Sequence, residues 1–240
     1  PQRLPSLKVL WMNIFSYSEP TEKETVSFRC LCKLFSKALK PLPCWTSFPH
    51  PKYSSLQELF GRFGELSEHG STNIPKLVLV DNGIHDEGGN SVTINIPICI
   101  IGESREHCIV MGGLWMNGKE EDDVNVSNLT LRQSKWDGVN GDHWGASFHL
   151  DNVSVENSEN DGIVVSGSKR STMKNCNVSH SKRHGLFVYN ALMTIDGNAT
   201  TIHHNNTGGW GDGLCTYASS SIHLVSPLTK EMISTNNHGG

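Results

Sequence analysis

The chain has 240 residues, of which 36% are hydrophobic and 18% are charged, and a formal net charge of −4. These values are typical of a folded globular protein, and an acidic chain with scattered Lys and Arg favours no nucleic-acid partner. No apolar run approaches the ~20 residues that a membrane span needs, and the first residues lack a signal-peptide pattern. The chain does not begin with Met and stops in mid-pattern, so we expect it to be part of a longer protein.

The first part of the chain, residues 1–66, has helical periodicity. Apolar residues fall three or four positions apart between 54 and 66 and again between 26 and 40, which places them on one face of a helix in each segment. Segments 51–55 and 69–75 are rich in turn-forming residues and are the natural linkers.

The pattern changes at Leu77. From there the chain consists of short β-branched runs, such as KLVLV, VTINIPICII, GIVV and LFVY, separated by Gly, Asn, Asp and Ser. Runs of this kind predict short β-strands joined by turns.

The strand region contains an internal repeat. Segments 128–139, 152–163 and 175–186 align without gaps, and 201–214 is a looser fourth copy. Each of the first three starts with Asn, has Ser at the seventh place, and has Gly followed by an aliphatic residue at its end. The marker glycines are Gly138, Gly162, Gly185 and Gly213, spaced 24, 23 and 28 residues apart. Strand-forming repeats of this length predict a solenoid.

This texture resembles the right-handed parallel β-helix of the pectin-lyase-like superfamily, over residues 77–240. The regular Leu ladder of leucine-rich repeats is missing, and propeller repeats are longer. The resemblance implies coils of short strands stacked ~4.8 Å apart. The helix near 54–66 would then cap the N-terminal end of the stack. No C-terminal cap is visible in the sequence, so we expect the repeats to be truncated there.

Stacked coils would align the residues that precede the marker glycines. These are Asp137, Asp161, His184 and Asp212. A column of three acids and a histidine could hold a cation, or act as acid and base. The alternative, which we favour, is that they form ordinary turns in which Gly takes a positive φ and Asp bonds its own backbone.

Two further sets of residues recur at the turns. Asn128, Asn152 and Asn175 favour a stacked hydrogen-bonding ladder. Trp136, Trp144 and Trp210 lie near the same turns and, with Arg183, are candidates for binding a ligand. Exposed indoles could stack on sugar rings or on a peptide, although packing over a coil edge is the more common role.

Enzymes of this superfamily need more than these residues. The resemblance to its polygalacturonase-like branch would require three acids, a Gly-His-Gly and an Arg-x-Lys, whereas this chain has only RHG at 183–185 and no Arg-x-Lys. The lyase branch binds calcium through clustered carboxylates and uses Arg or Lys as a base, and Arg183 beside the acid column keeps that alternative open. We therefore lean towards a protein that is not an enzyme.

The N-terminal region resembles an F-box. The motif residues are Leu4-Pro5, Ile14-Phe15 with Tyr17, Cys32-Lys33-Leu34-Phe35, and Trp45. Ser18 stands where the motif usually has Leu, and 21–25 replaces an Asp-Leu pair. The resemblance implies a small helical module that binds the Skp-type adaptor of cullin-RING ubiquitin ligases. The residues that would bind the adaptor are Leu4, Pro5, Ile14, Phe15, Leu31 and Phe35. The alternative is a helical cap on the β-helix.

The seven cysteines are odd in number and irregularly spaced. They favour free thiols in a reducing compartment, cytoplasm or nucleus, and we expect neither a metal site nor a cofactor.

The sequence thus predicts a mainly β protein: a right-handed parallel β-helix preceded by a small α-helical module. The expected domains are an F-box-like module at 1–48, a linker with a capping helix at 49–76, and the β-helix at 77–240. The expected function is a non-enzymatic substrate-recognition subunit of a cullin-RING (SCF-type) ubiquitin ligase, with an adaptor and an unknown substrate protein or glycan as partners. The alternative is a carbohydrate-binding or polysaccharide-cleaving β-helix.

Overall fold

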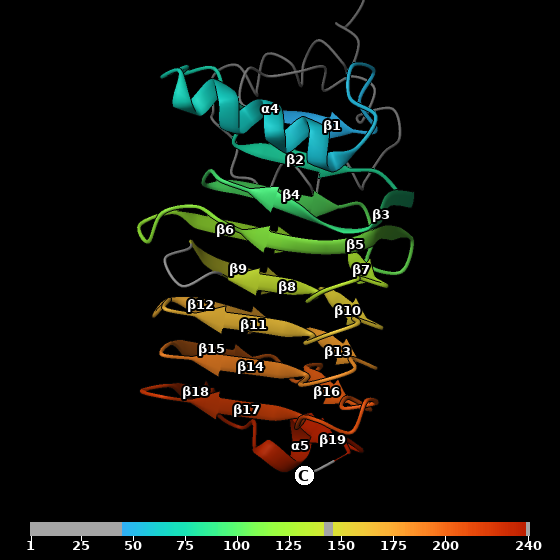
Figure 1. The fold of residues 1–240 in the computed structure, drawn as a ribbon, viewed down its shortest axis with the longest axis vertical. Coiled ribbons are helices and arrows are strands. Elements are labelled where there is room, and N and C mark those ends of the chain that lie inside the picture. Colours follow the sequence, from blue (N-terminus) through green and yellow to red (C-terminus); the bar gives the residue numbers. More distant parts are fainter. Residues whose placement is uncertain (1–44, 142–145, 239–240) are drawn as a thin grey trace, which may run out of the picture.

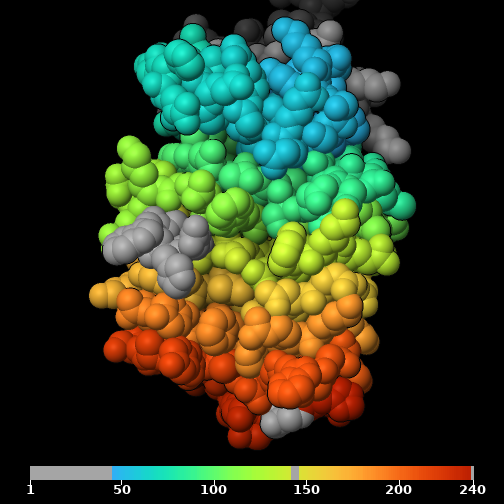
Figure 2. All heavy atoms as spheres, in the orientation of Figure 1, coloured from blue at the N-terminus to red at the C-terminus, as the bar shows by residue number. Residues whose placement is uncertain are grey.

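The computed structural model describes residues 45–141 and 146–238. The chain winds into a solenoid whose coils follow one another in sequence order from one end to the other (Figure 1). The space-filling view shows the same order as continuous coloured bands (Figure 2). The solenoid predicted from the repeat is therefore confirmed.

The first ladder of parallel strands runs the length of the stack. In spatial order it consists of β1 (Trp45–Phe48), β2 (Leu77–Val80), β4 (Ile98–Gly102), β6 (Asp123–Ser127), β9 (Ser147–Asp151), β12 (Ser171–Lys174), β15 (Leu192–Asp196) and β18 (Ser221–Leu224). Every neighbouring pair is parallel. Most of their inward side chains are aliphatic and buried, such as Val126, Leu150 and Met173.

Two more ladders complete each coil. The second consists of β7 (Thr130–Arg132), β10 (Ser154–Glu156), β13 (Asn177–Ser179), β16 (Thr201–His203) and β19 (Ser234–Thr235), and the third of β8 (Val139–Gly141), β11 (Ile163–Ser166), β14 (Leu186–Tyr189) and β17 (Leu214–Tyr217). The long strands β3 (Gly83–Ile94) and β5 (Cys108–Met116) pair with each other, and β5 pairs with both β7 and β8. A short helix, α5 (Lys230–Ile233), precedes β19.

Helix α4 (Leu56–Glu68) covers the β1–β2 end of the stack (Figure 1). Its apolar face, with Leu59, Phe60 and Phe63, is buried in the same core as the strands. Ser55 caps its start by accepting the N–H of Glu58 at 3.0 Å. The buried Glu87, from the irregular part of β3, accepts the N–H of Leu56 at 2.7 Å. The helix expected at 54–66 is therefore present and packs onto the strands.

The β-helix begins earlier in the chain than the sequence suggests. Residues 45–48, expected to end the F-box-like module, form β1, which pairs in register with β2. Trp45 is buried there. A four-residue strand with one aromatic at each end carries too little period-2 signal to be recognised without its partner strand. The β-helix therefore starts before residue 77, where the sequence placed its beginning, and includes residues 45–48 of the expected F-box-like module. The rest of the F-box-like module lies outside the described residues.

None of the helices in the described ranges is long and apolar enough to cross a membrane. Among the same residues, Cys99, Cys108, Cys176 and Cys215 are free thiols.

Candidate functional site: the corner between the second and third ladders

The predicted column of acids and histidine exists. The aliphatic residues after the marker glycines pair in register, Val139 with Ile163, Ile163 with Leu186, and Leu186 with Leu214. Backbone bonds join the residues before them: the N–H groups of Gly138, Gly162 and Gly185 donate to the carbonyls of Asp161, His184 and Asp212 at 3.0, 2.8 and 3.0 Å. The column therefore stands at the corner where each coil leaves the second ladder and enters the third.

The first three column side chains each bond the backbone of the next coil. Oδ1 of Asp137 accepts the N–H of Asp161 at 3.0 Å, and Oδ1 of Asp161 accepts the N–H of His184 at 2.8 Å. Nδ1 of His184 accepts the N–H of Asp212 at 2.9 Å. The expectation that the aspartates bond their own backbone is wrong, because in a stack the nearest unpaired N–H belongs to the neighbouring coil.

The marker glycines are needed for a different reason from the expected one. None of Gly138, Gly162, Gly185 and Gly213 has a positive φ. A Cβ on Gly162 would lie 2.5 Å from both the Gly185 carbonyl oxygen and Cγ1 of Val178. Glycine is required here because the next coil approaches too closely for any side chain.

Positive φ is taken instead by the asparagine column. Asn128, Asn152 and Asn175 have φ values of 55°, 56° and 52°, in the left-handed region that Asn tolerates better than most residues. Nδ2 of Asn152 donates to Oδ1 of Asn128 at 2.9 Å. The predicted ladder is therefore present between these two coils.

Two of the three carboxylates in the column are buried and well supplied with donors. Asp137 is 8% exposed and Asp161 is 3% exposed. Asp137 accepts Nδ2 of Asn160 and Nδ2 of Asn140, each at 2.6 Å. Burial raises the pKa of Asp161, and the nearby charge of Asp137 raises it further, while the His184 N–H and Arg183 act against this. Nη1 of Arg183 lies 3.7 Å from Oδ2 of Asp161.

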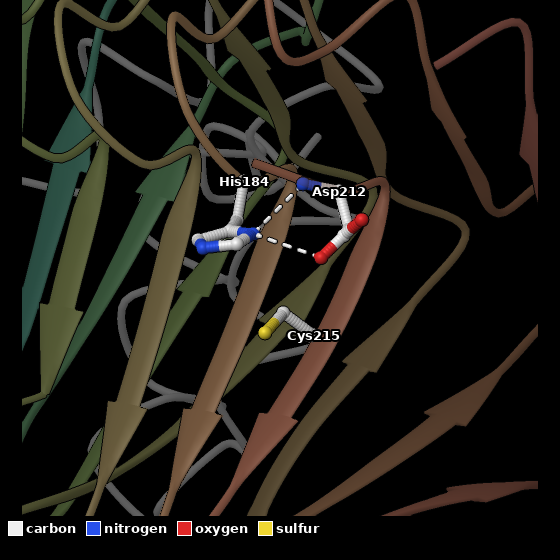
Figure 3. Close-up of side chains that lie close together, drawn as sticks. All are labelled: His184, Asp212 and Cys215. Carbon is white, nitrogen blue, oxygen red and sulfur yellow. Dashed lines mark hydrogen bonds and ion pairs between the residues drawn. The ribbon is translucent and has the colours of Figure 1, made fainter. Parts of the chain in front are cut away.

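A third ligand type joins the column at its far end. Cys215, on β17, brings its thiol beside His184 and Asp212, and one possible ligand atom from each lies within 4.8 Å of the other two (Figure 3). Nδ1 of His184 is 3.8 Å from Oδ2 of Asp212. Burial raises the pKa of Cys215, and the charges of Asp212 and Asp161 add to this. No signal in the sequence marks Cys215 as part of the site, because His184 and Asp212 are 28 positions apart and no metal motif spans that gap.

Outside the column lies a strip that we call the corner surface: the exposed Trp136, Arg183 and Trp210 and the half-buried Asn160. The Asn160 N–H donates to the Trp136 carbonyl at 3.3 Å, and the Arg183 N–H donates to the Asn160 carbonyl at 3.0 Å. Trp136 is 67% exposed and Trp210 is 83% exposed. These indoles therefore do not pack over a coil edge, although that is the more common role of such residues.

Several predicted residues fall outside the described ranges. They are Trp144 and the six adaptor-binding candidates Leu4, Pro5, Ile14, Phe15, Leu31 and Phe35.

The comparisons with known proteins support the fold. Residues 137–226 match a family described as right handed beta helix region. No curated protein and no solved structure matches the chain significantly. The match covers all four column residues and Cys215, so it supports the coil geometry on which this site depends.

Proposed function

We propose that the protein is a non-enzymatic substrate-recognition subunit of a cullin-RING ubiquitin ligase, acting in the cytoplasm or nucleus. The F-box-like residues would bind a Skp-type adaptor, and the β-helix would hold the target. The F-box resemblance supports the first half of this proposal, and the corner surface supports the second.

The exposed indoles of Trp136 and Trp210 are the main support for the proposal that the β-helix binds a target. Trp136 stands two coils before, and Trp210 one coil after, the coil that carries Arg183, whose side chain is 51% exposed. Aromatic and Arg side chains are the residue types that dominate binding energy at protein interfaces. The backbones of Trp136 and Arg183 are joined through Asn160 by hydrogen bonds between coils, so little backbone entropy is lost at these two positions when a target binds.

The column chemistry also favours binding over catalysis. Oδ1 of Asp137, Oδ1 of Asp161 and Nδ1 of His184 each accept a backbone N–H from the next coil. An acid or base engaged in holding the fold together is poorly placed to transfer protons to a substrate.

The test of the proposal is binding of the purified full chain to a Skp-type adaptor, measured by calorimetry. Ile14→Ala/Phe15→Ala should abolish adaptor binding, because it removes the apolar contact that the F-box motif supplies. Trp136→Ala/Trp210→Ala should leave adaptor binding unchanged, because these residues lie on the β-helix and not in the F-box-like module that would bind the adaptor. A wild-type chain that does not bind the adaptor contradicts the proposal.

A carbohydrate is the alternative ligand for the same corner surface, because indoles also stack on sugar rings. The rival enzyme hypothesis expects a groove in which the column side chains converge. Two surface hollows, of about 390 and 270 Å³, are lined by other residues, including Arg170 and Glu87 respectively. Binding or cleavage of polygalacturonate by the wild type would support this alternative. It should then be lost in Trp136→Ala/Trp210→Ala but kept in the control Ile84→Ala, which truncates an exposed apolar side chain elsewhere.

A further inference from the structure

We infer that His184, Asp212 and Cys215 form a binding site for Zn²⁺ or a chemically similar divalent transition metal. The inference is independent of the proposed function. Its basis is the approach of three different ligand atoms to within 4.8 Å of one another (Figure 3). Among the described residues, no other group of three His, Cys, Asp or Glu side chains brings its ligand atoms so close.

The spacing suits one ion. Zinc binds nitrogen and carboxylate oxygen at ~2.0–2.2 Å and thiolate sulfur at ~2.3 Å, so a nitrogen and an oxygen ligand of one tetrahedral ion lie roughly 3.3–3.5 Å apart. The 3.8 Å between Nδ1 of His184 and Oδ2 of Asp212 is a few tenths of an ångström longer, so the two side chains need to move only slightly closer to share an ion. A small rotation of the Cys215 side chain, which is half-buried at the solvent edge, would bring the sulfur in.

The fold fixes all three residues through the coil register. His184 and Asp212 occupy the same corner position on consecutive coils, because Leu186 and Leu214, two residues further along, pair in register. Cys215 pairs with Phe187 in the parallel β14–β17 ladder. In two coils the side chain three residues after the corner contacts the corner residue: the Phe187 ring stacks on His184 at 5.3 Å, and Asn140 bonds Asp137. In the β17 coil this position holds a thiol.

The ligand types select the metal. Thiolate with imidazole favours zinc and similar ions over calcium or magnesium, which take oxygen ligands. On binding, the Cys215 thiol gives up its proton to solvent and the sulfur bonds the metal. Nδ1 of His184 exchanges its bond from the Asp212 N–H for the metal. Because the Asp212 side chain is 44% exposed, water can occupy the fourth position.

The decisive experiment is a titration of the metal-free full chain with Co²⁺ and with Zn²⁺. We expect a thiolate-to-cobalt charge-transfer band in the wild type and saturable Zn²⁺ binding by equilibrium dialysis. Cys215→Ser should abolish the band and lower the Zn²⁺ affinity by more than about tenfold. A loss of about tenfold is the lower limit when a group that only supports a metal ligand is mutated, and removing a ligand itself should cost more. His184→Asn, which keeps an acceptor for the Asp212 N–H, should lower the affinity similarly.

The matched control is Cys30→Ser/Cys32→Ser, which removes the other closely spaced cysteines of the chain. It should keep both the band and the Cys215-dependent binding. Thermal unfolding of each variant without metal checks that the fold is retained. Equal affinity in the wild type and Cys215→Ser would overturn the inference, and so would a wild type without a thiolate band. A band lost in the control but kept in Cys215→Ser would place the metal elsewhere, and would also overturn it.

Discussion

Three histidines meet at the corner where the second ladder ends. Nδ1 of His203 lies 2.7 Å from Nδ1 of His204, and the His180 ring stacks on the His204 ring with centroids 5.5 Å apart. Nε2 of His203 is 2.9 Å from Oδ1 of Asn177. Burial lowers the pKa of His203 from its ordinary value of 6.5, and positive charge on His204 or His180 lowers it further, while Glu156 acts in the opposite direction.

This cluster predicts acid sensitivity. As the pH falls through 6.5, the unfolded chain takes up a proton at this position before the folded chain does, so the free energy of unfolding decreases until the pH is below the lowered folded pKa. His203→Asn should therefore lose less stability than the wild type between about pH 8 and about pH 5. Urea unfolding at a series of pH values checks this. Parallel pH profiles for the two proteins would contradict the prediction.

At the scale of the element, the turn from β10 into β11 shows why coil spacing restricts sequence. Gly162 lies directly over the next coil, where the carbonyl oxygen of Gly185 and the side chain of Val178 leave no room for a Cβ. The turn cannot move away, because the Gly162 N–H and the Ile163 N–H bond the carbonyls of His184 and Gly185 at 2.8 and 2.9 Å.

Gly162→Ala should therefore destabilise the protein by about 3 kcal/mol, the upper part of the range for overpacking. Gly61→Ala is the matched control, because a Cβ there meets no atom within 4 Å and the residue lies inside helix α4. The control should raise the free energy of unfolding by about 0.5–1 kcal/mol. Chemical denaturation of both variants tests the pair. A Gly162→Ala variant as stable as the wild type would show that the coils can separate locally at little cost.

At the scale of the whole molecule, each coil contacts mainly the coils beside it, as expected for a solenoid. Helix α4 packs at one end, where Phe60 and Phe63 lie edge to face with ring centroids 5.9 Å apart. The helix thus protects the β1–β2 end, whereas β11 is flanked on both sides by the paired strands β8 and β14.

Phe60→Ala should consequently have a local effect. Removing this buried ring costs about 3–5 kcal/mol, and because coupling passes between neighbouring coils, the loss should weaken β1 and β2 most. Amide hydrogen exchange should become faster in residues 45–48 and 77–80 while residues 163–166 change little. Equal acceleration in all three segments would instead indicate that the molecule unfolds as one cooperative unit.

The sequence by itself determined the solenoid, because each repeat from Asn128 onward has the same kind of turn and an inward aliphatic residue at the same place. It also identified helix α4 from its apolar spacing, and the column of Asp137, Asp161, His184 and Asp212 from their common place before Gly. These features depend on residues close together in the chain.

Only the tertiary structure decided what those residues contact. Trp45 joins the β-helix because β2 lies beside it, and the marker glycines are small because of atoms in the next coil. Cys215 meets His184 because two strands 28 residues apart pair in register. Such contacts depend on the alignment of separate coils, to which the spacing within one coil gives no direct guide. The contacts at the corner therefore depend on how the coils stack, whereas the tendency to form stacked coils is encoded in each repeat.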